Sequence, residues 1–387
     1  MPGSATPDVV VVGAGMIGAA CAEALSAAGV RVLVIDRDGP AAGTTASGEG
    51  NVLVSDKEPG PELELAIASR AEWDVVLSRL PERVADVEWE TKGGVVVATT
   101  DPEPLKAFAA KQRAAGVDAR VITPAEAFEL EPLLTPRVTV GVHYPDDAQV
   151  QPVLAATALL AAVRDRGGEV RSGVTARAIR RSAQERVVGV ETDDGVIACG
   201  AVLNACGPWA GSFSADAGAP IQVLPRRGVI LVTAPLPECV RHKVYDADYV
   251  GAVGSGDAEL QTSTVVESTR SGTILIGSSR ERIGFDDSVR VKVLRELAAK
   301  AVGLFPFLAD VPVMRAYGGF RPYAPDHLPV IGPDPRTPGL WHATGHEGAG
   351  IGLAPSTGRL ITELFLGLAP HVDPDPFRVD RPAVLAS

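Results

Sequence analysis

The sequence predicts an α/β fold of two domains, one discontinuous and built on a parallel sheet, the other an α+β domain built on a mainly antiparallel sheet. Apolar runs at residues 9–12 and 30–35 flank a glycine turn and an Ala-rich helical stretch, which is the order of a βαβ unit. The same βα order returns from residue 151 onward. Between residues 221 and 282, by contrast, Val/Ile/Thr-rich segments of strand length alternate with Gly, Pro and Ser clusters, as in an antiparallel sheet.

The segments between the two βα regions indicate where the chain passes from the first domain to the second and back. Residues 61–80 have helical character, and the run GGVVVATT at 93–100 then breaks the βα rhythm, so a second domain is expected to begin near Pro81. A long Ala/Leu helix at 152–165 returns the chain to the first domain. After it, the turn at residues 193–195, Asp-Asp-Gly, is typical of a β-hairpin.

The last part of the chain is expected to complete both domains. A helix is predicted at 288–304, and a glycine-rich region from Gly319 leads to a closing helix at 356–366. This last helix is expected to begin near Pro355, because proline is favourable in a first helical turn. The predicted first domain comprises residues 1–80, 149–219 and 319–387, and the second comprises 81–148 and 220–318.

Composition and charge exclude several classes of function. Lys and Arg total 36 against 48 Asp and Glu, a net charge of −12, so a nucleic acid partner is not expected. The four cysteines have no C-x-x-C spacing, so neither a disulfide framework nor a metal site is predicted. The N-terminus, MPGSATPD, does not have the pattern of a signal peptide, and no long apolar stretch follows. We therefore expect a cytoplasmic protein with no membrane span, and the sequence leaves its oligomeric state open.

A dinucleotide site is predicted at the first strand–helix junction. VVVVGAGMIGAACAEAL places Gly13, Gly15 and Gly18 in G-x-G-x-x-G spacing directly after a strand. These glycines permit a tight turn, close approach of a pyrophosphate and close helix–strand packing. Asp36 ends the second strand and is expected to bind the adenosine ribose. The pattern predicts a Rossmann-type domain for FAD or NAD, which share the ADP half.

Four segments together resemble the D-amino-acid oxidase superfamily of FAD-dependent oxidoreductases, especially its glycine oxidase, sarcosine oxidase and D-hydroxyproline dehydrogenase branch. They are the glycine fingerprint with Asp36, AAGTTASGEGN at 41–51, VLNACGPWAG at 202–211 and HATGHEGAGIGLAPSTGRLITELFLG at 342–367. The resemblance covers most of the chain and implies FAD as cofactor. Some relatives attach the flavin through a cysteine, but RPYAPDH at 321–327 contains none, so non-covalent FAD is expected.

The resemblance also implies which residues hold the cofactor. Small residues in the 41–51 segment would allow close approach of the backbone, and the helix after GHEGAG would point its positive end at the pyrimidine ring of the flavin. The predicted cofactor-binding residues are Gly13, Gly15, Met16, Ile17, Gly18, Asp36, Arg37, Thr44, Thr45, Ala46, Ser47, Gly48, Gly50, Asn51, Val174, Ala205, Cys206, Gly207, Trp209, Gly319, Arg321, Gly345, His346, Glu347, Gly348, Gly350 and Ile351.

The substrate side is predicted around one arginine. GGFRPYAPDHLPVIG at 318–332 resembles the family segment whose arginine binds the substrate carboxylate, which makes Arg321 the anchor. Guanidinium offers two parallel donors that fix both distance and orientation of a carboxylate. The resemblance implies hydride transfer to the flavin from the carbon that bears nitrogen, giving an imine that hydrolyses, with no strong base required. The alternative for Arg321 is a structural ion pair.

Further catalytic candidates are less specific. Tyr245 and Tyr249 lie in YDADY, about where relatives place tyrosines over the substrate, and His346 lies in the GHEG tetrad. A tyrosine in a strand is often ordinary packing, and an isolated histidine is often structural. Glu49, Asn51, His327 and Glu347 are also candidates to line the pocket.

We therefore expect FAD-dependent oxidation of the C–N bond of a small amino acid or N-substituted (secondary) amino acid, with oxygen or a protein as electron acceptor. The resemblance favours a secondary amine, because several members of the branch use one. Three alternatives stay open: a flavin subunit of a multi-subunit amine or imino acid dehydrogenase, an FAD-dependent hydroxy acid or polyol dehydrogenase, and a non-catalytic nucleotide-binding protein. The GHEG tetrad at 345–348 resembles the dehydrogenase-type branch and supports the first of these.

Overall fold

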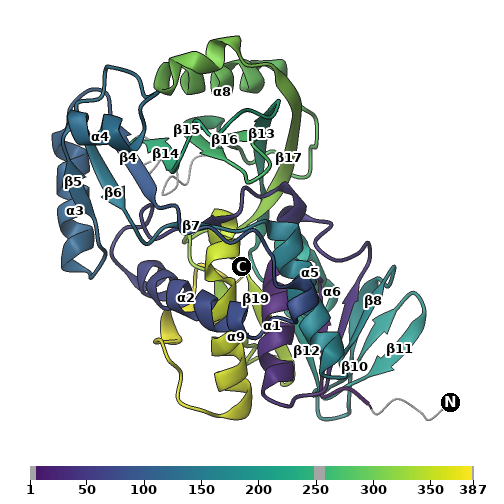
Figure 1. Ribbon diagram of the computed structural model, residues 1–387. Helices are drawn as coiled ribbons and strands as arrows, with labels where there is room; N and C mark the ends of the chain where they lie inside the picture. The colour runs from purple at the N-terminus through teal and green to yellow at the C-terminus, as the bar shows by residue number, and fades with distance from the viewer. Residues whose placement is uncertain (1–5, 248–257, 386–387) are drawn as a thin grey trace.

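A computed structural model describes residues 6–247 and 258–385, and two large sheets organise this part of the chain (Figure 1). The first has six strands in the order β18-β19-β12-β1-β2-β8, parallel except for the pair β18 and β19. Its strands are β1 (Val9–Val12), β2 (Val32–Asp36), β8 (Glu169–Ser172), β12 (Ala201–Asn204), β18 (Val330–Pro333) and β19 (Leu340–Thr344). Three distant segments of the chain thus form one sheet of the predicted Rossmann type.

The two faces of this sheet pack against different layers. Along β1, Val9 and Val11 join the core formed with the helices, whereas Val10 and Val12 join a second core beneath a small antiparallel sheet. The helices are α1 (Met16–Ala27), α2 (Pro61–Ser78), α5 (Pro152–Asp165) and α9 (Gly350–Leu366), and the small sheet contains β9 (Ala176–Arg181), β10 (Val187–Thr192) and β11 (Gly195–Ala198). This alternation follows from the two-residue period of a strand. The predicted hairpin at residues 193–195 joins β10 to β11.

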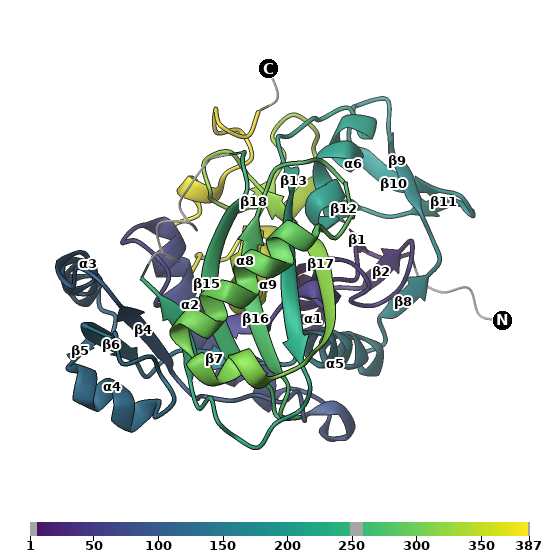
Figure 2. The ribbon, with the colours of Figure 1, turned by 90° about the horizontal axis from the view of Figure 1, so that it is seen from above.

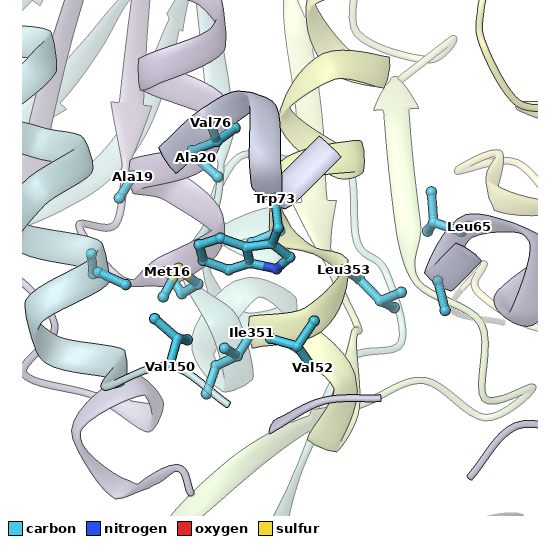
Figure 3. Packing of buried hydrophobic residues seen from close by; sticks show 14 of the residues in the cluster. Met16, Ala19, Ala20, Val52, Leu65, Trp73, Val76, Val150, Ile351 and Leu353 are labelled. Atoms are coloured by element: carbon cyan, nitrogen blue, oxygen red, sulfur yellow. The ribbon is translucent and has the colours of Figure 1, made fainter. Parts of the chain in front are cut away.

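Helix α9 differs from the prediction, because it begins at Gly350 and contains Pro355 in its interior. Proline interrupts the regular hydrogen-bond ladder of a helix. One turn is closed instead by Ser69 of α2, whose hydroxyl donates to the Gly352 carbonyl at 2.7 Å and accepts from the Ser356 N–H at 3.2 Å. The ring nitrogen of Trp73 donates to the same carbonyl, and Figure 3 shows this indole packed among residues of α1 and α9.

The second large sheet has eight strands in the order β17-β13-β16-β15-β14-β4-β6-β5. Its strands are β4 (Gly94–Ala98), β5 (Arg120–Ile122), β6 (Val140–Tyr144), β13 (Leu224–Thr233), β14 (Lys243–Asp246), β15 (Gln261–Ser268), β16 (Ile274–Arg280) and β17 (Val313–Tyr323). All pairs are antiparallel except β14 with β4, so the predicted, mainly antiparallel sheet is confirmed. Helix α8 (Val291–Leu304) covers one face, as Figure 2 shows.

Smaller elements lie between the strands of these sheets along the chain. They are α3 (Glu103–Ala114), α4 (Pro124–Leu130), α6 (Ala210–Asp216) and the two-stranded pair β3 (Asn51–Val52) and β7 (Ala148–Gln149). The domain limits at residues 80, 148, 219 and 318 stay predictions, and β17 runs across the last of them. Within the described ranges, none of the helices combines the length and apolar character needed to cross a bilayer.

Candidate active site

The turn between β1 and α1 leaves room only for backbone. Gly13 has φ +110°, and a Cβ at this position would overlap the carbonyl of Ala205. A Cβ at Gly18 would overlap the Gly13 carbonyl, so α1 starts in direct contact with the turn. The first-turn N–H groups of a helix have no acceptor within the helix, and they attract anions. Here the Met16 N–H donates to Thr45 Oγ1 at 2.9 Å, which ties the 44–47 segment to the helix start. Gly15, Met16 and Ile17 line the cleft, so this helix start could hold a pyrophosphate.

Asp36 is fixed at the end of β2 by backbone donors. Its Oδ2 accepts from the Ala14 N–H at 2.7 Å and its Oδ1 from the Asp38 N–H at 2.8 Å. Each oxygen retains a second lone pair, and the side chain lines the cleft, so the carboxylate can accept from ribose hydroxyls. The Val174 N–H donates to the Asp36 carbonyl at 2.9 Å, which leaves the Val174 carbonyl for an adenine contact.

The predicted cofactor residues converge on one cleft that starts at this turn and ends at the eight-stranded sheet. Those that line it are Gly13, Gly15, Met16, Ile17, Asp36, Arg37, Thr44, Thr45, Ser47, Gly48, Asn51, Val174, Ala205, Cys206, Gly207, Trp209, Gly319, Arg321, His346, Glu347, Gly348, Gly350 and Ile351. Gly18, Ala46, Gly50 and Gly345 do not line it. Gly50 and Gly345 have positive φ values of +96° and +78°, so they shape the turns around the cleft.

Arg321 lies at the sheet end of this cleft. It belongs to β17, and its guanidinium covers Gly228 of the paired strand β13, where a Cβ would overlap it. Nη1 donates to the Ser279 carbonyl at 2.9 Å, which fixes the group at the wall. A Cβ at Gly348 would lie 3.5 Å from Nε, so the loop before α9 borders the same guanidinium. The absence of side chains at Gly228 and Gly348 lets Arg321 reach the cleft.

Glu347 is ionised within a group of cations. Its carboxylate forms an ion pair with the buried Arg226 and lies 3.3 Å from His327 Nδ1. Burial opposes its ionisation, but His327, Arg226 and Arg280 outweigh this and lower the pKa of Glu347 to about 2. Arg280 also lines the cleft. Sequence reasoning missed Arg226 and Arg280; the available signal was a cation within or at the end of an apolar strand, as in ILIGSSR.

His346 is neutral, because burial lowers its pKa to about 3. Its Nε2 lies 3.0 Å from Thr357 Oγ1, and that hydroxyl donates to the Leu353 carbonyl at 2.8 Å. Nε2 must therefore carry the proton and donate. Nδ1 is an unprotonated acceptor that has no hydrogen-bond partner among the described residues. His346 can thus accept a hydrogen bond at Nδ1 but has no proton to give there.

The structure does not bring Tyr245 to the cleft, which corrects the prediction for this residue. Tyr245 lies in β14 opposite Val96 and Val265, is fully buried, and donates its hydroxyl to Ser55. The register of β14 turns this ring into the core. Tyr249, the second predicted tyrosine, lies outside the described residues.

The wall that contains Glu49 has a second set of buried polar groups. Glu49 Oε2 accepts from Asn51 Nδ2 at 3.1 Å, and both residues line the cleft. The Lys243 ammonium donates to Asn51 Oδ1 and pairs with Glu267 at 2.8 Å. The sequence singled out Glu49 and Asn51, but the contribution of Lys243 depends on strand pairing and could not be foreseen.

Comparison with known proteins identifies the family. The model of the DAO family, described as FAD dependent oxidoreductase, matches residues 8–364. The chain belongs to this family. The glycine oxidase of Pseudomonas aeruginosa is 31% identical over 95% of this chain and 97% of its own length. Hydrogen cyanide synthase subunit HcnC of the same organism is 29% identical over 97% and 96%.

A solved structure extends the likeness to three dimensions. The crystal structure of glycine oxidase from Geobacillus kaustophilus superposes with a TM-score of 0.87 at 27% identity, covering 97% of this chain and 99% of that one. Two curated relatives of this chain are bifunctional ThiO/ThiG proteins, which are much longer. The chain spans 53% of their length. The glycine turn, Asp36 and the two helix starts fit FAD, and the protein is an FAD-dependent oxidoreductase.

Proposed function

We propose that this protein oxidises the C–N bond of a small amino acid or N-substituted amino acid. The observation that carries the proposal is the position of Arg321: its guanidinium lies at the wall of the same cleft whose other end holds the glycine turn and Asp36. The glycine oxidase relatives support oxidation of an amino acid by FAD in general. The proposal includes amino acids with a free nitrogen and amino acids with a substituted nitrogen, each with a small side chain.

In the proposed mechanism the chain mainly binds and orients. Arg321 binds the substrate carboxylate with two donors, which fixes the attached α-carbon in the cleft. FAD supplies the hydride acceptor when bound. His346, neutral and without a proton to give, does not compete as an acid, and Glu347 stays ionised beside Arg226. A nitrogen that keeps its lone pair can then form the C=N bond, and the imine hydrolyses in water.

The remaining cofactor contacts are proposed from the lining of the cleft. Asp36 would bind the ribose, the start of α1 the pyrophosphate, and Gly348, Gly350 and Ile351 at the start of α9 the pyrimidine end of the flavin. We further propose that FAD is held without a covalent bond. Residues 321–327 contain no cysteine, and burial holds the pKa of the cleft-lining Cys206 thiol at about 12, which disfavours a reactive thiolate.

Anaerobic flavin reduction tests the proposed function. Glycine, sarcosine and both enantiomers of proline are mixed with the enzyme under nitrogen, and bleaching of the flavin absorbance is followed. At least one amine is expected to bleach it, whereas glycolate and lactate are expected to be inactive. Bleaching by the hydroxy acids alone would replace the proposal with a hydroxy acid dehydrogenase.

A second proposal concerns the electron acceptor, because the similarity to hydrogen cyanide synthase subunit HcnC relates the chain to a protein named as a subunit. In this proposal the chain is the flavin subunit of an amine or imino acid dehydrogenase and passes electrons to a protein. The amine that bleaches the flavin is then expected to support rapid dye reduction with little peroxide. Rapid peroxide formation by the isolated chain would favour oxygen as the acceptor.

A further inference from the structure

We propose that the Glu49 carboxylate receives the amino group of the substrate, opposite Arg321, and takes up its proton. The inference rests on the proposed amine oxidation and deepens it. It makes Glu49 a substrate-binding residue that selects a zwitterion over a hydroxy acid.

Glu49 has one carboxylate oxygen to which the described residues offer no partner. The side chain is 8% exposed, and Oε1 is buried with no hydrogen bond, while Oε2 accepts from Asn51. No ion pair within the described residues involves this carboxylate. A buried carboxylate is costly without a cation or several donors. A cationic ligand group in the cleft would supply the missing partner.

The neighbours of Glu49 fix which of its two oxygens is left without a partner among the described residues. Lys243 has only donors, so the Asn51 oxygen must face its ammonium and the Asn51 nitrogen must face Glu49. Lys243 is itself neutralised by Glu267 at 2.8 Å. The half-buried Asn51, with Lys243 and Glu267 buried behind it, therefore holds Oε2 in place, and none of the three brings a charge that satisfies Oε1.

The two charged groups lie over the same region of the eight-stranded sheet. The Arg321 guanidinium covers Gly228, and Glu49 Oε1 covers Gly277, because a Cβ at either glycine would overlap that group. Leu231 pairs with Ile276, so Gly277 lies opposite Ile230, two residues along β13 from Gly228. Standard strand spacings place the two glycines about 8 Å apart. An α-amino acid with one charge-assisted hydrogen bond at each end spans roughly this distance.

The proton transfer balances within this arrangement. The substrate ammonium gives one proton to Glu49 Oε1, the N–H bond breaks, and the electron pair stays on nitrogen. The carboxylate becomes a carboxylic acid, and the neutral nitrogen can form the C=N bond as hydride leaves the α-carbon. A hydroxyl group in the same place would leave the buried carboxylate without a cation, so hydroxy acids bind poorly.

The test compares Glu49→Gln with the wild-type holoenzyme by anaerobic stopped-flow reduction with glycine and sarcosine from pH 6 to 10. At low substrate concentration, the reduction rate of the wild type is expected to have a plateau as the pH changes, because the bound substrate ammonium can give its proton to Glu49 within the complex. In Glu49→Gln only free amine reacts, so the rate should rise about tenfold per pH unit up to the substrate pKa. At low substrate and below the substrate pKa, the variant should therefore react more slowly than the wild type by about tenfold for each pH unit that separates the pH from that pKa.

Binding of acetate gives a readout that does not depend on turnover. Acetate is glycine without the amine, and it perturbs flavin absorbance when it binds beside the flavin. Glu49→Gln should bind acetate as tightly as the wild type or more tightly, since a negative charge is removed. The exposed Glu58 provides the matched control, and Glu58→Gln should change neither the pH profile nor acetate binding.

The outcomes separate this inference from the proposed function. If an amine bleaches the wild type but Glu49→Gln keeps the plateau and the amine affinity, the role of Glu49 is wrong and amine oxidation stands. If no amine bleaches the wild type and hydroxy acids do, the proposed function itself fails. If Glu49→Gln does not retain FAD, Glu49→Asp is used in its place. We expect its reduction rate to stay independent of pH, as in the wild type, and its affinity for the amine to fall. If the rate instead depends on pH while acetate still binds, the inference is overturned.

Discussion

The two ends of the cleft bind by different physical means. At the nucleotide end, the binding groups belong to the backbone. Gly13 and Gly18 allow two chain segments to lie in contact, and the start of α1 offers N–H groups. At the substrate end, charged side chains line the cleft, namely Glu49, Glu347, Arg280 of β16 and Arg321 of β17. Arg226 of β13 pairs with Glu347, and Lys243 of β14 donates to Asn51 beside Glu49. We therefore expect the nucleotide end to be sensitive to added atoms at Gly13 and Gly18, and the substrate end to be sensitive to changes of charge.

The largest expected effect is therefore steric and lies at the nucleotide end. Gly18→Ala would drive a methyl group into the Gly13 carbonyl, so the turn must open and stability should fall by about 1–3 kcal/mol with loss of bound FAD. The ratio of flavin to protein absorbance and the melting temperature measure this. Gly29→Ala is the matched control: φ is +84° but no atom lies within 4 Å, so it should cost about 1–2 kcal/mol and keep FAD. Full FAD content in Gly18→Ala would contradict the steric account.

At the substrate end the largest effect is expected from Arg321→Met. Removing the guanidinium should weaken amino acid binding about 100-fold while FAD stays bound, because the change lies away from the glycine turn. Arg321→Lys keeps the charge but not the paired donors and should recover only part of the affinity. Stopped-flow reduction against substrate concentration measures both. Arg315→Met, at an exposed position of the same strand, is the control, and an equal loss in that variant would show a general effect on β17.

The difference between the two ends also explains what the sequence could predict. Gly13, Gly15, Gly18 and Asp36 lie within one short stretch whose spacing is set by local geometry, so the Rossmann-type fold and its turn were predictable. Arg226, Arg280 and Lys243 reach the site through pairing of distant strands, and no spacing in the chain encodes that register.

Two predictions failed for equally specific physical reasons. The sequence predicts Tyr245 over the substrate, but the register of β14 directs it into the core. The sequence also predicts that α9 begins near Pro355, because proline is favourable in a first helical turn. Here Ser69, which is remote in sequence, bridges the interrupted ladder and allows the helix to begin at Gly350.

A smaller effect for a change of one pH unit is expected through His346, which borders the substrate end. Its folded pKa of about 3 is below its unfolded value of 6.5, so between these values the unfolded chain binds a proton that the folded chain does not. Stability is therefore complete above pH 6.5 and should fall by about 1.4 kcal/mol per pH unit as the pH decreases toward 3. His346→Gln should flatten the dependence of urea unfolding on pH by this slope. The same substitution at His371 serves as control and should keep the slope that His346 contributes.

The smallest effect is expected from a side chain at the nucleotide end. Cys206 lines the cleft, but its neighbours there act through backbone, and burial keeps its thiol protonated. Cys206→Ala should therefore change FAD affinity by less than about 0.5 kcal/mol. Acid precipitation should release the yellow colour into the supernatant for both wild type and variant. Flavin that stays with the precipitated wild type but not with Cys206→Ala would reveal a covalent bond, and the nucleotide end would then depend on a side chain as strongly as the substrate end depends on Arg321.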